Sequence, residues 1–76
     1  MLLDQKTTKI RQEILALLQT RDEITEEEID AIAKKHNIDP DLARLAVADL
    51  LTAKKEGTYT KTREAARLLE QLKHKT

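Results

Sequence analysis

The sequence predicts an all-α fold, a compact four-helix orthogonal bundle with a helix-turn-helix-like corner. Apolar residues recur at helical spacing in four segments, helix-starting and helix-ending residues separate these segments, and strand-like alternation is absent. A length of 76 residues suits one domain, spanning residues 1–76, with one core. That core must be aliphatic, because the chain has no Phe, no Trp and a single Tyr.

The first predicted helix spans residues 4–20. Its apolar residues Ile10, Ile14, Leu17 and Leu18 recur at helical spacing, and polar residues fill most of the positions between them. This pattern is typical of an amphipathic helix that buries one face. A short polar connection follows the helix.

The second predicted helix spans residues 25–37. Thr25 can accept a hydrogen bond from the backbone of the first turn, and Glu28 can accept one in return, which together form a capping box. Ile24 can pack on Ile29 as a hydrophobic staple. Asn37 tolerates the left-handed backbone conformation that ends many helices, so we expect the helix to end there.

The third predicted helix spans residues 39–56 and should be the most buried element. Asp39 is its expected N-cap, and Pro40 suits the first helical position, where a missing amide costs nothing. Apolar residues cover more than half of its circumference. Lys54 and Lys55 would favour the negative end of its dipole, and Gly57 would end it.

The fourth predicted helix spans residues 60–74, with Thr58 or Thr60 as its cap and a stripe of Ala65, Leu68, Leu69 and Leu72. The four helices predict one shared core. Its expected members are Ile14, Leu18, Ile29, Ile32, Ile38, Leu42, Val47, Leu50, Leu51, Leu68, Leu69 and Leu72.

Charge is balanced overall but divided along the chain. Fourteen basic and fourteen acidic residues give zero net charge, which lacks the excess of positive charge typical of nucleic-acid-binding domains. Residues 1–43 hold 6 basic and 10 acidic side chains (−4), whereas residues 44–76 hold 8 and 4 (+4). One interpretation is that acids lie at helix starts and bases at helix ends. The other is a patch for phosphate or an acidic protein surface, made of Lys54, Lys55, Lys61, Arg63 and Arg67.

A helix-turn-helix corner is indicated by three residues. Ala33 is small enough for two helices to cross closely, Asn37 suits a left-handed turn, and Ile38 leads into the next helix. In this order they resemble the helix-turn-helix of transcription regulators and winged-helix domains. The resemblance covers roughly residues 25–55, and it implies that the following helix faces DNA with Arg44 as its base-reading residue.

This sequence departs from the family pattern in two places. Asp39, Pro40 and Asp41 stand where the family usually presents polar or basic residues to the bases, and carboxylates there would repel phosphate. The segment after Gly57 shows no strand alternation, so the sequence predicts no wing.

Catalytic chemistry has few candidate residues. The chain has no Cys and no Ser, and none of its nine Thr stands beside a His. The only imidazoles are His36, expected to be partly buried and bonded to a helix end, and His74 near the end of the last helix. The sequence therefore predicts no enzyme, no catalytic residue, no metal site and no cofactor.

These observations favour a non-enzymatic small helical domain that needs no partner to fold. One Gly, no Ser and 37% charged residues make an unusual composition, which suggests a de novo designed or engineered scaffold without an evolved ligand. The alternative is a natural helix-turn-helix module that binds DNA or an acidic protein through its basic C-terminal half. Without a targeting or spanning segment, the expected location is soluble and cytoplasmic, away from membranes.

Overall fold

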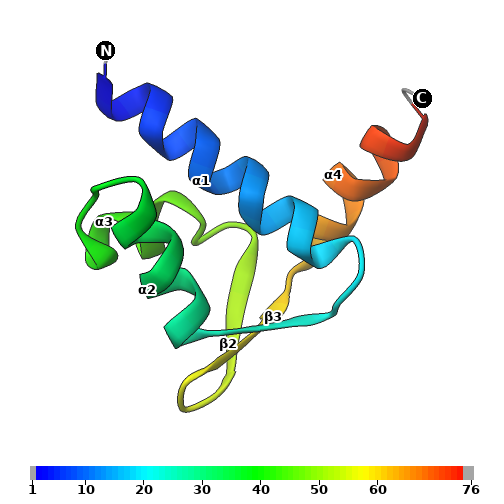
Figure 1. Cartoon of the computed structure of the whole chain (residues 1–76). Helices are drawn as coiled ribbons and strands as arrows, with labels where there is room; N and C mark the ends of the chain where they lie inside the picture. The colour runs from blue at the N-terminus through cyan, green and yellow to red at the C-terminus, as the bar shows by residue number, and fades with distance from the viewer. Residues whose placement is uncertain (1, 75–76) are drawn as a thin grey trace.

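The computed structural model describes the backbone of residues 2–74 and the side chains of residues 5–74. The described elements are four helices and three strands (Figure 1). Their order is α1 (Leu2–Leu18), β1 (Glu23–Thr25), α2 (Glu26–Lys35), α3 (Pro40–Ala46), β2 (Leu51–Lys55), β3 (Thr58–Lys61) and α4 (Arg63–His74).

The predicted all-α helical bundle is wrong, because the structure contains a three-stranded antiparallel sheet. The predicted third helix of residues 39–56 ends at Ala46, turns through residues 47–50 and continues as β2. Lys54 and Lys55 are therefore strand residues, and Gly57, with φ +78°, lies in a hairpin turn rather than at a helix end. The hairpin of β2 and β3 follows the helical corner, where the sequence predicted no wing.

The sheet has strand order β1–β3–β2. Ile24, Tyr59 and Ala53 are aligned across the three strands; Ile24 is fully buried and Tyr59 packs against the core, whereas Ala53 is exposed. Thr25 is aligned with Thr58 on the other face. Thr58 and Thr60, the expected caps of the last helix, are residues of β3, and their β-branched side chains suit a pleated surface.

One core joins the sheet to the helices. The buried apolar residues are Ile10, Ile14, Leu18, Ile24, Ile29, Ala33, Ala43, Val47, Leu50, Leu51, Ala65 and Leu69. Two predicted core residues are wrong, since Leu42 is 43% exposed and Leu72 is 41% exposed. Ile32, Ile38 and Leu68 are only partly buried and pack against this core.

The helix starts are largely as predicted. The Thr25 hydroxyl accepts a hydrogen bond from the Glu28 amide at 3.2 Å, and the Glu28 carboxylate accepts one from the Thr25 amide at 2.9 Å, which confirms the capping box. Asp39 caps α3 with Pro40 at its start. For α4 the prediction is wrong, because the capping hydroxyl belongs to Thr62, which accepts from the Ala65 amide at 3.1 Å.

None of the helices in the described part of the chain is long and apolar enough to cross a membrane.

Candidate functional site

The outward face of α3 is apolar. Leu45 is 72% exposed, Leu42 is 43% exposed, and Ala48, in the turn after the helix, is also exposed. The opposite face carries Ala43 and Val47 into the core. A strongly exposed leucine lowers solubility and contributes no buried apolar area to folding. The apolar ridge of Leu42, Leu45 and Ala48 is therefore a candidate contact surface.

Arg44, the predicted base-reading residue, is held in a cluster of carboxylates. Its Nη2 lies 2.9 Å from Glu26 Oε1 and 2.7 Å from Asp30 Oδ1, and its Nη1 lies 2.9 Å from Asp41 Oδ1. Burial lowers the pKa of Arg44, but the neighbouring Asp30 and Glu26 carboxylates prevail and raise it above the ordinary value. The Arg44 guanidinium therefore already forms its ion pairs within the molecule.

The surroundings of α3 are consequently acidic. Three carboxylates surround one guanidinium, and the side chains of Glu26, Asp30 and Asp41 remain partly exposed to water. Asp39 adds a fourth carboxylate, which accepts a hydrogen bond from the Asp41 amide at 2.8 Å. We use the name α3 surface for the apolar ridge Leu42, Leu45 and Ala48 together with its acidic rim Glu26, Asp30 and Asp41.

A small pocket lies beside this ridge, between α3 and the sheet. It has a volume of about 150 Å³ and is lined by Ile29, Arg44, Val47, Ala48, Leu51 and Tyr59. Ala48 belongs both to the ridge and to the pocket, so the two form one continuous surface. The lining is apolar apart from Arg44 and the hydroxyl of Tyr59.

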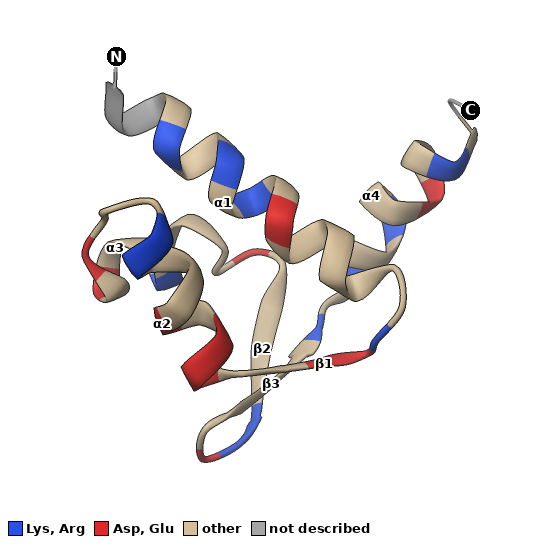
Figure 2. Ribbon diagram, viewed as in Figure 1, with Lys and Arg blue, Asp and Glu red and all other residues tan. Residues whose placement is uncertain are grey.

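The other predicted binding residues lie on β2, β3 and α4. The strand register places Lys55 beside Thr58 at the hairpin end of the sheet and Lys61 beside Leu51 at the other end. Arg63 and Arg67 lie on α4, beyond that second end. Figure 2 shows basic segments on α1, at the end of α2, in the hairpin and on α4.

Two of these basic residues are also paired with acids of β1 or the residue before it. Lys54 forms an ion pair with Glu23, and Lys61 Nζ lies 3.2 Å from Asp22 Oδ1. The opposite charges of the two chain halves thus meet in space. Among the described residues, Lys55, Arg63 and Arg67 form no ion pair within 4 Å.

Both histidines contact carboxylates. His36 Nε2 lies 2.6 Å from Glu13 Oε2, so His36 bonds to α1 and not to a helix end as predicted. The hydrogen bond from Lys35, with a smaller contribution from His36, holds the pKa of Glu13 below its ordinary value. His74 lies 3.4 Å from Glu70 on the same helix. Within the described residues, no three His, Asp or Glu side chains gather in a way that could hold a metal ion.

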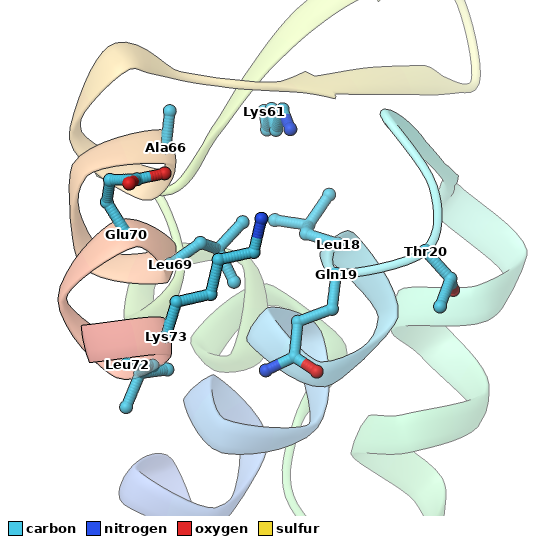
Figure 3. Close-up of a pocket in the computed structure, with 9 residues that line it drawn as sticks. All are labelled: Leu18, Gln19, Thr20, Lys61, Ala66, Leu69, Glu70, Leu72 and Lys73. Carbon is cyan, nitrogen blue, oxygen red and sulfur yellow. The ribbon is translucent and has the colours of Figure 1, made fainter. Parts of the chain in front are cut away.

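A larger hollow of about 520 Å³ separates the end of α1 from α4 (Figure 3). Leu18, Leu69 and Leu72 line it, but so do Lys61, Glu70 and Lys73. Figure 3 shows the Lys73 side chain extending toward Leu18 across the hollow. The mixed charges give this hollow no preference for a ligand of either sign.

Comparisons of the chain with protein-family models, with curated proteins and with solved structures find no match. The resemblance to helix-turn-helix proteins and the designed origin both stay predictions from the sequence.

Proposed function

We propose that the chain is a non-enzymatic binding module of the helix-turn-helix kind that docks a protein segment through the α3 surface. The observation that carries the proposal is the 72% exposure of Leu45 on the outward face of the second helix of the corner. In a DNA-binding member this face would present hydrogen-bonding side chains to base edges, whereas here it presents leucine.

The element order supports the helix-turn-helix part of the proposal. Two helices joined by the left-handed Asn37 are followed by the hairpin of β2 and β3, which occupies the place of a wing. The hairpin tip packs against the start of α2, where the Glu26 amide donates to the Gly57 carbonyl at 3.0 Å.

The charge around α3 favours a protein over DNA. Glu26, Asp30 and Asp41 place three carboxylates where phosphates would lie, and Arg44 neutralises only one of them. In the basic half, Lys54 and Lys61 are paired with acids, which leaves Lys55, Arg63 and Arg67 as the predicted residues that could meet phosphates. An apolar ridge with an acidic rim instead suits an apolar segment flanked by basic residues.

The proposal is tested by selecting binders from a random peptide library displayed on phage, with the full chain as bait. We expect the selected peptides to combine large apolar residues with Lys or Arg, and to lose binding to the Leu45→Lys variant. The matched control is Leu72→Lys, which places the same charge on a partly exposed leucine of α4 and should leave binding unchanged.

Selected peptides that bind the Leu45→Lys variant as well as the original chain would contradict the proposal. A selection that yields no binding peptide would also contradict it and would favour a scaffold without a ligand. Tight, sequence-selective capture of duplex DNA in a parallel selection would favour the DNA-binding alternative.

A further inference from the structure

We infer that the pocket beside α3 receives one large apolar side chain from a basic segment of a partner protein. The inference rests on the proposed function and specifies the chemistry of its partner. It depends on two features of the described residues, which are the size and lining of the pocket and the charge around it.

The pocket has the size and lining of an anchor site. Its volume is about 150 Å³, and an apolar cavity of roughly that volume holds a benzene-sized group. Ile29, Val47 and Leu51 form apolar walls from α2, the turn after α3 and β2, and Tyr59 adds its ring from β3. Because the walls come from four elements of one core, the pocket is formed before a partner arrives.

The negative charge around the pocket favours a positively charged partner segment. After Arg44 is counted, the cluster with Glu26, Asp30 and Asp41 keeps an excess of two negative charges. Lys54 of β2 does not offset this excess, because it pairs with Glu23. Lysine or arginine residues on either side of the apolar anchor would face these carboxylates, whereas acidic flanks would be repelled.

The test uses the full ¹⁵N-labelled chain and a five-residue peptide with a central phenylalanine and two lysines on each side. We expect chemical-shift changes at the amides of Ala48, Leu51 and Tyr59. Replacing the phenylalanine by alanine should weaken binding at least about tenfold, which is the smallest loss of affinity expected when a buried aromatic ring is removed. Replacing the four lysines by glutamates should abolish the changes.

Two variants separate the pocket from Leu45, which does not line it. Ala48→Phe places a ring at the pocket from an exposed position and should block the peptide, while Leu72→Phe on α4 is the matched control and should not. If Ala48→Phe binds normally and Leu45→Lys does not, the pocket inference is overturned and the proposed function stands. If Leu45→Lys binds normally and Ala48→Phe does not, Leu45 loses its role, which contradicts the proposed function, and the pocket keeps its own.

Three further results would overturn the inference. Equal binding of the alanine peptide would mean that charge alone attracts the lysines. Shift changes confined to the hollow between α1 and α4 would place the peptide elsewhere. No shift changes at millimolar peptide would mean that the pocket takes no such anchor.

Discussion

Asn37 ends α2 with φ +58°, a conformation that Asn and Gly adopt far more easily than β-branched residues. We expect Asn37→Gly to be neutral or to stabilise the fold by up to about 1 kcal/mol, because glycine has no Cβ to strain. Asn37→Val should lower the free energy of unfolding by more than about 1 kcal/mol. Urea denaturation of both variants checks this, and equal effects would contradict a left-handed residue here.

Glu28 predicts a pH dependence of stability. The hydrogen bonds from Arg21 and from the Thr25 amide lower the pKa of Glu28 from 4.5 to about 2. The folded state thus binds this proton less readily than the unfolded state. The ionised Glu28 carboxylate therefore stabilises the fold fully above pH 4.5, and this contribution is lost as the pH falls toward 2. Because the pair is largely exposed, the effect should be modest.

The measurement is the free energy of unfolding between pH 2 and 6 for the original chain and for Glu28→Gln. The variant should be less stable above pH 4.5, and the two curves should converge as the pH falls to about 2. A constant difference between the two free energies of unfolding across this range would contradict the lowered pKa of Glu28.

Single-residue features were the most predictable from the sequence. Thr25, Asn37 and Asp39 act on the backbone within three residues of themselves, so their local chemistry decides their role. The partners of Arg44 could not be predicted in the same way. Asp30 and Glu26 lie 14 and 18 residues before it, and only the crossing of α2 and α3 brings them together.

At the scale of elements, the hairpin of β2 and β3 was missed for a physical reason. The predicted helix of residues 39–56 includes Leu50 and Leu51 because both continue its apolar pattern, yet Leu50 reaches the core from a turn and Leu51 from the start of a strand. Only Leu51 of β2 is buried, so the strand shows no alternation. The available signal was Glu56-Gly57 followed by Thr58, Tyr59 and Thr60, a turn leading into good strand formers.

Gly57 provides the test of that hairpin. Its φ of +78° is strained for any residue with a Cβ, although no atom lies within 4 Å of where the Cβ would be. We expect Gly57→Ala to cost about 1–2 kcal/mol through the backbone alone. Gly57→Asn should cost less, because Asn tolerates this conformation. If thermal unfolding shows both variants to be unaffected, the turn does not have this geometry.

At the scale of the molecule, one aliphatic core holds the sheet and the helices together. Leu50 is fully buried, whereas Leu42 was predicted to be buried and is 43% exposed. Leu50→Ala should therefore lower the free energy of unfolding by about 2–5 kcal/mol. Leu42→Ala should have a much smaller effect, and guanidinium denaturation compares the two. Similar losses would mean that α3 is more deeply buried than the structure indicates.

The division of charge along the chain was visible in the sequence, but its spatial consequence was not. Counting charges by halves suggested a basic patch, whereas folding places Lys54 and Lys61 beside Glu23 and Asp22 of the acidic half. Arg44 likewise crosses to acids of α2. Such pairs depend on strand register and helix packing, which one-dimensional charge counts do not contain.

The central claim is that α3 faces a protein and not DNA, and duplex DNA binding tests it most directly. We predict that fluorescence anisotropy at physiological salt will detect only weak, sequence-independent binding, with a dissociation constant of about 10⁻⁴ to 10⁻⁶ M that rises with salt. Arg44→Ala should not weaken it, because Arg44 is already paired with carboxylates. A nanomolar, sequence-selective complex that is lost in Arg44→Ala would contradict the claim.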